Sequence, residues 1–373
     1  MNKNKELNEA IDQSTYDTYT HSDRVSITDQ LTYVRALKRI DAVVIKVITS
    51  KDVLFIENKL QEGLPSHANG LGKSFKHCLN GSIIEICRRY PHHKFSASFE
   101  LLRKHAESMG ITLISPYSCS SEILNDCVSR IREEAYSEGF LKTLDDSYRS
   151  TRKNYASLIR YLRGLHSRYS KLLVIRIDLA YLREFCQAKE HECLTYSEVK
   201  QDREAFLKYL RKLMPKVGLV GYAWKTEHGI EKSYHHHFML LFDGQRVRED
   251  ITIGEYVGQY WRDVITKNRG YFYSCNRKKS NYKTLGVGMI CHSDEVMKEG
   301  MEIAALYLTK ADGYAKLVTP DKSRTFGKGT LVNAGQSGRG RPRNFKRGPL
   351  LAMQIANAEL SGKVRQKINK SEK

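Results

Sequence analysis

The chain has 373 residues, of which 40% are hydrophobic and 28% are charged, a balance typical of a globular protein. Its formal net charge is +20, and so large an excess of lysine and arginine attracts polyanions, nucleic acid first. We find no apolar run of about 18 residues, so we expect no membrane-spanning segment. The N-terminus lacks the apolar core of a signal peptide, and none of the 8 cysteines forms a C-x-x-C pair. We therefore expect reduced thiols, a cytoplasmic location and no zinc ribbon or finger.

The first 144 residues mix short helical patterns with polar stretches and carry no chemical motif that can be named. From residue 145 the apolar spacing becomes regular. It predicts a helix over 145–170 whose apolar residues share one face: Tyr155, Leu158, Ile159, Leu162 and Leu165. A strand rich in branched side chains follows over 171–179. The chain thus divides into an accessory region, residues 1–144, and a second domain, residues 145–330.

Within that domain the patterns alternate between helix and strand. In chain order they predict a helix over 197–214, strands over 218–227 and 234–242 joined as a hairpin, a helix over 250–266, strands over 270–275 and 286–292, and a helix over 294–310. The helix over 250–266 has its apolar stripe at Ile253, Tyr256, Val257, Tyr260, Trp261 and Val264. This order predicts an α+β fold in which an antiparallel sheet has a ferredoxin-like βαββαβ core, with a largely helical region before it.

Residues 331–373 form a Gly-rich basic segment that we expect to be a flexible tail. Arg339-Gly-Arg341-Pro resembles the core of an AT-hook, whose arginines lie in a narrow minor groove. A solvated tail with general phosphate affinity is the alternative. In either case Arg339, Arg341 and Arg343 are candidate DNA-binding residues, and their affinity should fall steeply with salt.

Three consecutive histidines head the strand over 234–242. Side chains alternate between the faces of a strand, so His235 and His237 point one way and His236 points the other. If the hairpin pairs Glu227 with His235, the carboxylate joins both imidazoles on one face. Three protein ligands leave coordination positions open, as a catalytic metal needs, and the same set suits zinc. The alternatives are a solvated edge strand and a shifted register in which His236 is a ligand.

Tyr307 and Lys310 stand three residues apart on the last predicted helix and so share a face. A phenol has a reference pKa of about 10, so ionising it at pH 7 costs roughly 4 kcal/mol. A nearby ammonium and a divalent ion would both lower that cost. A tyrosine that attacks phosphorus forms a covalent phosphotyrosine. Taken alone, however, this spacing is equally that of a boundary tyrosine and a solvated lysine.

The order of these motifs resembles that of the HUH endonucleases, which nick DNA through a tyrosine. The resemblance is closest to the inovirus gene II-type replication proteins, the YagK/YfjJ C-terminal domain family. It covers about residues 145–330, and it rests on the segments "SRYSKLLVIRIDLAY", "GYAWKTEHGIEKSYHHHFMLLFDG", "GEYVGQYW", "GVGMI", "LYLTK" and "RTFGKG". The resemblance implies a rolling-circle initiator that nicks one strand of origin DNA and later rejoins it.

The resemblance also implies roles for residues, metals and partners. The metal ligands would be Glu227, His235 and His237, and the ion Mg or Mn. Tyr307 would be the nucleophile, and Lys310 would position or neutralise the phosphate or the phenolate. The partners would be single-stranded DNA at a replication origin and a host helicase or polymerase in the bacterial cytoplasm.

Three further positions complete the set that the resemblance implies. Arg176 and Asp178 belong to the matching strand and have a supporting role, in which Arg176 is a DNA-binding candidate. Tyr314 is a second tyrosine almost on the face of the first, although Gly313 would end the helix before it. His236 departs from the family pattern, in which the middle residue is hydrophobic.

Three other functions stay open at this point. A sheet of this kind binds single-stranded nucleic acid without chemistry through basic and aromatic residues, for which Tyr271, Phe272 and Tyr273 are candidates. A zinc-dependent hydrolase would use the same three ligands. A single-strand transposase of the HUH class would use the same tyrosine. The recognised DNA sequence, the oligomeric state, the role of residues 1–144 and the kind of replicon do not follow from the sequence.

Overall fold

The computed structural model of the chain describes residues 29–57, 67–80, 82–186, 194–212, 214–229, 233–281, 284–310 and 315–331. These residues form two compact units. A helical unit holds the residues up to Arg152 together with Ala315 and Lys316, and a sheet unit holds Lys153–Lys310 and 317–331. Among these residues, no helix is both long enough and apolar enough to cross a membrane.

The helical unit is built from short helices around an apolar core. Three of its helices begin at a capping side chain that accepts a backbone N–H, namely Asn69, Ser96 and Ser120. Two small two-stranded sheets, an antiparallel one of β1 with β2 and another of β3 with β9, complete it. Its elements are α2 (Asp29–Thr49), β1 (Phe55–Ile56), β2 (His67–Ala68), α3 (Gly70–Leu79), α4 (Ser82–Arg89), β3 (His93–Phe95), α5 (Ala97–Ser108), η1 (Ile111–Leu113), α6 (Ser121–Ala135), the first part of α7 (Glu138–Arg168), and β9 (Ala315–Leu317).

The sheet unit follows the predicted order of elements closely. After the second part of α7 come β4 (Lys171–Tyr181), α8 (Arg183–Cys186), α9 (Tyr196–Lys212), α10 (Met214–Val217), β5 (Leu219–Gly229), β6 (Ser233–Asp243), α11 (Asp250–Gln259), η2 (Tyr260–Ile265), β7 (Gly270–Ser274), η3 (Cys275–Asn281), β8 (Gly288–Cys291), α12 (Glu295–Lys310) and β10 (Phe326–Lys328). Each predicted strand and helix from 171 to 310 is present, so the expected α+β class is confirmed.

One six-stranded sheet organises this unit. Its strand order is β10-β5-β6-β4-β7, and β8 pairs with β4 beside β7. Every pairing is antiparallel. The strand that begins the domain, β4, therefore lies between β6 and the β7–β8 edge, and the β5–β6 hairpin lies at its other side.

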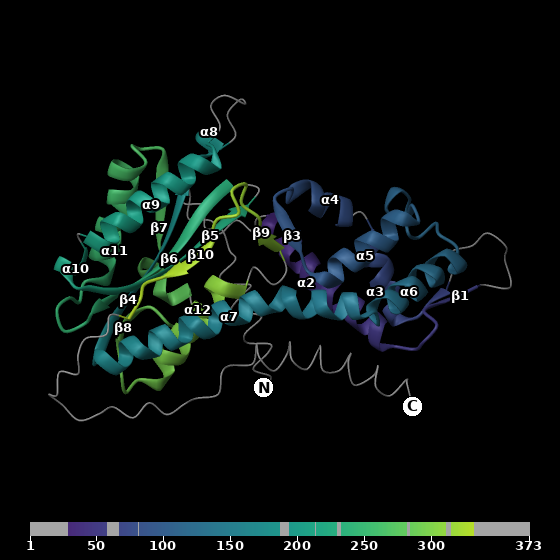
Figure 1. Ribbon diagram of the computed structural model, residues 1–373, viewed down its shortest axis with the longest axis horizontal. Coiled ribbons are helices and arrows are strands. Elements are labelled where there is room, and N and C mark those ends of the chain that lie inside the picture. Colours follow the sequence, from purple (N-terminus) through teal and green to yellow (C-terminus); the bar gives the residue numbers. More distant parts are fainter. Residues whose placement is uncertain are drawn as a thin grey trace. The chain divides into compact units, whose positions relative to one another are not determined.

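The two faces of the sheet are covered by different helices (Figure 1). We call the face that carries Glu227 the front face and the opposite one the back face. The back face packs against α9 and α11 through a core that includes Ile177, Phe206, Phe238 and Trp261. The front face carries α7 and α12, and Tyr161 and Leu165 of α7 lie so close to Gly221 of β5 that a side chain at Gly221 would overlap them.

Two expectations differ from the structure. Tyr256 and Val264, expected in the apolar stripe over 250–266, are 59% and 53% exposed. Tyr260–Ile265 is a π-helix, in which the Thr266 N–H donates to the Trp261 carbonyl, so the 3.6-residue period ends there and Val264 leaves the stripe. Tyr256 precedes that segment and lies on the exposed side of α11. The boundary expected between residues 144 and 145 lies inside α7, and the described chain divides between Arg152 and Lys153.

Candidate metal centre and tyrosine

The β5–β6 hairpin brings a carboxylate and two imidazoles to one face. Glu227 pairs directly with His235, and Lys225 pairs with His237. This is the register that the sequence predicts, and it is confirmed. Since directly paired residues of an antiparallel ladder point to the same side, Glu227, His235 and His237 all project from the front face.

Hydrogen bonds fix the orientation of both imidazoles. Nδ1 of His235 donates to the backbone carbonyl of Ser233 over 3.1 Å, and Nδ1 of His237 lies 2.6 Å from Oδ1 of Asp178 on β4. With Nδ1 engaged in each ring, both histidines turn Nε2 toward Glu227. A carboxylate or carbonyl behind an imidazole is the usual support of a metal-binding histidine, because it fixes the tautomer and makes the ligand nitrogen more basic.

The three side chains fit a metal ion. Oε2 of Glu227 lies 3.8 Å from Nε2 of His235 and 3.5 Å from Nε2 of His237, and one ligand atom from each residue lies within 4.8 Å of the others. Nε2 of His237 is buried and has no hydrogen-bond partner among the described residues. A buried nitrogen aimed at a carboxylate is a ligand position, so this group can hold a divalent cation with coordination positions to spare.

The charges around the centre also favour a cation. Burial acts to raise the pKa of Glu227, but His237 and His235 outweigh it and hold that pKa at about 2. Burial acts to lower the pKa of His237, but Asp178 and Glu227 raise it to about 9. The side chains of Glu227 and Asp178 remain 18% and 20% exposed, so the centre is reached from solvent on the carboxylate side.

Tyr307 of α12 lies against this centre. Its ring centroid is 5.4 Å from that of His237, with the rings nearly perpendicular. The guanidinium of Arg176, on β4, lies over the same phenol ring at 4.2 Å from its centroid. Arg176 is 4% exposed, whereas Tyr307 is half-buried. The predicted nucleophile therefore shares the front face with the predicted ligands, next to a fixed positive charge.

Two local features place α12 over the sheet. Asp294, the residue before the helix, accepts the N–H of Met297 as an N-cap, which agrees with the predicted start. Gly300 packs directly on the backbone of Leu285 and Gly286, where any side chain would overlap the Leu285 carbonyl. The helix is thereby held close to the segment before β8, and its last turns carry Tyr307 to the centre.

Sequence reasoning missed two residues that support the site, Asn276 and Lys225. Asp178, expected to have a supporting role, contacts the candidate ligand His237 directly. Asn276 fills the gap between β7 and β8: its amide accepts from the Arg176 N–H and donates to the Val174 carbonyl, as a strand would. Lys225 is 1% exposed and lies 3.4 Å from the Thr325 hydroxyl, and its charge adds to those that keep Glu227 ionised. No local motif marks these positions, because the β4–β6 register and the course of η3 create them.

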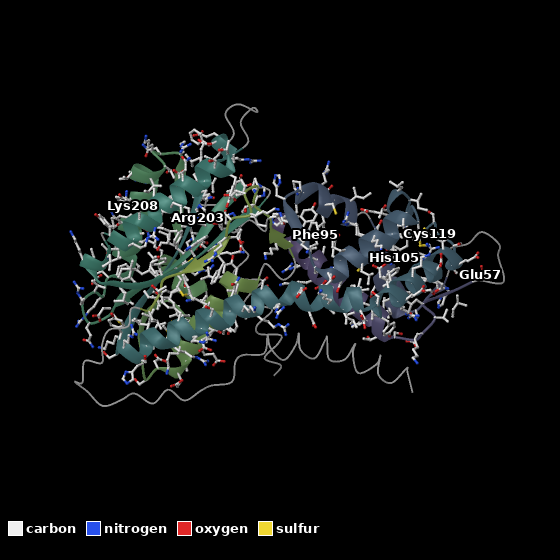
Figure 2. The ribbon with its side chains drawn as sticks, viewed as in Figure 1. Glu57, Phe95, His105, Cys119, Arg203 and Lys208 are labelled. Carbon is white, nitrogen blue, oxygen red and sulfur yellow. The ribbon has the colours of Figure 1, made fainter. Side chains whose placement is uncertain are left out.

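His236 points to the back face, so the register in which it is a ligand is wrong. It is fully buried, its ring lies 5.7 Å from that of Trp261, and its Nδ1 is 2.9 Å from the Thr226 hydroxyl. That hydroxyl also accepts a hydrogen bond from Arg203 of α9. Arg203 is buried, whereas Lys208 on the same helix is exposed; both are labelled in Figure 2. The contact with the Thr226 hydroxyl gives this buried imidazole a polar partner.

Several predicted residues lie outside the description. Lys310 ends α12, but its side chain is not among those described. Tyr314, Arg339, Arg341 and Arg343 fall outside the described residues altogether, as does most of the tail.

Comparison with known proteins places the chain in a family. Searches of curated proteins and of solved structures find no match to it. The family model of the YagK/YfjJ C-terminal domain matches residues 134–329, a span that contains the whole metal centre, Tyr307 and the six strands of the sheet. The chain is thus a member of the YagK/YfjJ C-terminal domain family.

Proposed function

We propose that this protein is a metal-dependent endonuclease of the HUH class that cuts single-stranded DNA through Tyr307 and rejoins it. The observation that carries the proposal is the convergence of Glu227, His235 and His237 with the phenol of Tyr307 on the front face. The more specific function is rolling-circle replication of the gene II type, which the sequence resemblance implies.

The order of the strands supports a ferredoxin-like core of the HUH kind. Read along the chain, β4, α9, β5, β6, α11 and β7 follow the βαββαβ pattern, and they stand in the sheet in the order β5-β6-β4-β7. In this arrangement the hairpin strand that carries the histidines is central, beside the first strand. It therefore receives support from both neighbours, Asp178 on one side and Glu227 on the other.

The charge distribution supports a polyanionic substrate at this unit. Residues 153–331 contain 31 lysines and arginines against 20 acidic residues, whereas residues 1–152 contain 21 against 20. The basic excess therefore lies in the sheet unit and in the segment after it, which holds Arg339, Arg341 and Arg343. Such a field raises the local concentration of nucleic acid and its rate of association.

Each front-face residue has a task in the proposed cut. Glu227, His235 and His237 hold the cation, and Asp178 keeps the His237 ring in place. When bound there, a divalent ion acts as a Lewis acid on a non-bridging oxygen of the scissile phosphate. Arg176 favours the ionised phenolate form of Tyr307 from which the attack starts, because its guanidinium is held over the phenol ring.

The proposed chemistry balances as a transesterification. The phenol oxygen of Tyr307 loses its proton to solvent and forms a bond to phosphorus, while the bond between phosphorus and the 3′ oxygen breaks. The 3′ oxygen takes up a proton and leaves as a hydroxyl, and the 5′ phosphate stays on the tyrosine. Attack of a 3′ hydroxyl on the phosphotyrosine reverses these steps and rejoins the strand without an external energy source.

The test is the covalent adduct itself. Wild-type protein is incubated with single-stranded oligonucleotides, labelled at the 3′ end, that tile the DNA around the gene encoding this chain. We expect a labelled band at the mass of protein plus DNA in Mn²⁺ or Mg²⁺ and none in EDTA. Peptide mapping should place the DNA on Tyr307. An adduct on another residue, or no adduct with any tile in either metal, would contradict the proposal.

The donor set itself favours one other function. Two histidines and a glutamate also suit zinc, and a zinc hydrolase needs no tyrosine nucleophile. Metal analysis of the purified protein, followed by nuclease assays with each ion, separates the two. Activity with zinc that survives the loss of Tyr307 would establish the hydrolase instead.

A further inference from the structure

Beyond the metal centre, the front face carries two tyrosines on the edge strand β7. Tyr273 pairs directly with Asp178, and Tyr271 pairs with Ala180. Asp178 points to the front face, because it contacts His237 there. Directly paired residues share a face, and so do residues two apart on a strand, so both tyrosines project from the front face.

Phe272, between them, independently confirms this orientation. Gly258 of α11 packs so closely on Phe272 that any side chain at the glycine would overlap the ring. Since α11 covers the back face, Phe272 points backward and its two neighbours point forward. The segments α11 and η2 both pack on β7 from the back. Tyr271 and Tyr273 are half-buried.

The tyrosines continue the row of side chains that contains the metal ligands. Across the sheet, Tyr273, Asp178, His237 and Lys225 stand opposite one another in a single row. Tyr273 is two strands from His237, which places their backbones about 10 Å apart. Tyr271 is about 7 Å further along its own strand. Both aromatic rings thus lie on one side of the candidate metal centre. Their distance from it suits a neighbouring nucleotide and is too long for the scissile phosphate itself.

The segments on either side of β7 are basic. Lys267 is exposed in the turn before the strand, and Lys278 follows it in η3, where the neighbouring Arg277 pairs with Glu255 of α11. A chain of phosphates that passes along β7 therefore meets positive charge at both ends of the strand. An aromatic surface between cations is the arrangement with which proteins bind unpaired nucleic acid, since every base has a face that stacks.

We infer that Tyr271 and Tyr273 form a stacking platform for unpaired bases of the DNA strand next to the scissile phosphate. The inference rests on the proposed nuclease function for the identity of the strand, but the contact itself needs neither the metal nor Tyr307. The platform holds the strand so that the adjoining phosphate lies at Glu227, His235 and His237. It takes bases of any sequence, because stacking reads no hydrogen-bonding pattern.

Binding in EDTA tests the platform without any chemistry. The probe is a fluorescein-labelled oligo(dT), and fluorescence anisotropy gives its dissociation constant. Stacking is worth about 1–3 kcal/mol per base, so the double substitution Tyr271→Leu with Tyr273→Leu, which removes the stacking of two bases, should weaken binding at least about 30-fold. The double substitution to Phe should stay within about twofold of wild type, because it keeps both rings. Tyr256→Leu, an exposed tyrosine on α11, is the matched control and should also change nothing.

A second arm uses wild-type protein, so it does not depend on a variant that folds. Oligo(dT) with abasic nucleotides should bind wild-type protein more weakly, and the loss should disappear in the double Leu variant. An oligo(dT) with 2-aminopurine should be quenched on binding to wild type and not to that variant. Equal binding of abasic and intact DNA by wild type, or a Phe variant as weak as the Leu variant, would overturn the platform.

The outcomes also separate this inference from the proposed function. If the base-dependent loss occurs but no adduct forms in Mn²⁺ or Mg²⁺, the platform holds and only the chemistry fails. If the adduct forms on Tyr307 while abasic DNA and the Leu variant behave as wild type, the chemistry holds and only the platform fails.

Discussion

Four buried imidazoles of the sheet unit differ in what stands beside them. On the front face His235 and His237 share Glu227, and His237 also contacts Asp178. His236, one residue away, contacts a hydroxyl on the back face. His166 of α7 is fully buried, and neither of its ring nitrogens has a hydrogen-bond partner in the described chain.

The protonation of these rings follows their surroundings rather than their burial. Two carboxylates raise the pKa of His237 to about 9. Burial, together with the charges of Lys298 and His292, lowers the pKa of His166 to about 4, and burial with the charge of Arg203 lowers that of His236 well below its usual range. A buried histidine thus becomes a cation site where strand register brings a carboxylate to it, and otherwise it is a neutral core residue.

The largest expected effect comes from Tyr307, the tyrosine beside His235 and His237. Tyr307→Phe removes the nucleophilic oxygen and keeps the ring under Arg176. Adduct formation should fall by at least about 10⁴-fold, whereas Mn²⁺ affinity and the melting temperature should stay as in wild type. Gel analysis of the adduct and isothermal titration calorimetry measure the two. Tyr256→Phe is the control and should keep full activity; loss of metal binding in the Tyr307 variant would show that the tyrosine acts structurally.

Removing a ligand should separate the two kinds of histidine. His237→Ala leaves two of the three candidate ligands and removes the ring that Asp178 supports, so Mn²⁺ affinity should drop by more than about 100-fold and the adduct should vanish. His166→Leu, at a site with no carboxylate, is the control and should bind Mn²⁺ as wild type does. Equal metal affinity in both variants would place the ion elsewhere.

The carboxylate-free histidine should reveal itself through pH instead. The folded pKa of His166, about 4, lies below the ordinary 6.5, so between these values the unfolded chain binds the extra proton. The contribution of His166 to the free energy of unfolding is fully present above about pH 6.5. Up to about 3 kcal/mol of it is lost as the pH falls toward 4. Urea unfolding at pH 7 and pH 4.5 should therefore show a smaller loss for His166→Leu than for wild type. Parallel losses would mean that the ring is not buried neutral.

A smaller loss of metal affinity is expected when Asp178, the carboxylate that contacts His237, is changed. Asp178→Asn keeps the shape but removes the charge that fixes the His237 ring, and such partners are worth about 10- to 100-fold in metal affinity. Calorimetry with Mn²⁺ measures the change, and Asp263→Asn, at an exposed carboxylate on η2, is the control. An Asp178 variant with unchanged affinity would assign the fixed orientation of His237 to packing alone.

The hairpin and its three front-face ligands were predictable from sequence because they rest on local rules. Alternation along a strand sorts the three histidines, and a short polar loop limits the registers in which Glu227 can pair. The same holds for α12, where Asp294 and the apolar spacing mark the helix. The sequence-based elements and the described ones agree to within a few residues for this reason.

Long-range placement was not predictable in the same way. Whether Asp178 stands behind His237 depends on the register of β4 against β6, two strands separated in the chain by three helices and a third strand. Asn276 acts through a gap between two edge strands, and the exposure of Val264 follows from a π-turn that no periodicity reveals. Such features depend on how distant segments meet, and a single sequence contains no direct signal for them.

The smallest expected effect is at the middle histidine, His236, which points to the back face between two residues that point to the front. His236→Leu replaces the buried imidazole with an apolar side chain. It removes one contact to the Thr226 hydroxyl, which still accepts from Arg203, so stability should change by less than about 1.5 kcal/mol in either direction. Mn²⁺ affinity should stay within about twofold of wild type, because no ligand atom is altered. Calorimetry and urea unfolding on the same sample measure both. If this variant lost metal as His237→Ala does, His236 would have to face the ion. The separation of the four histidines into two kinds would then be wrong.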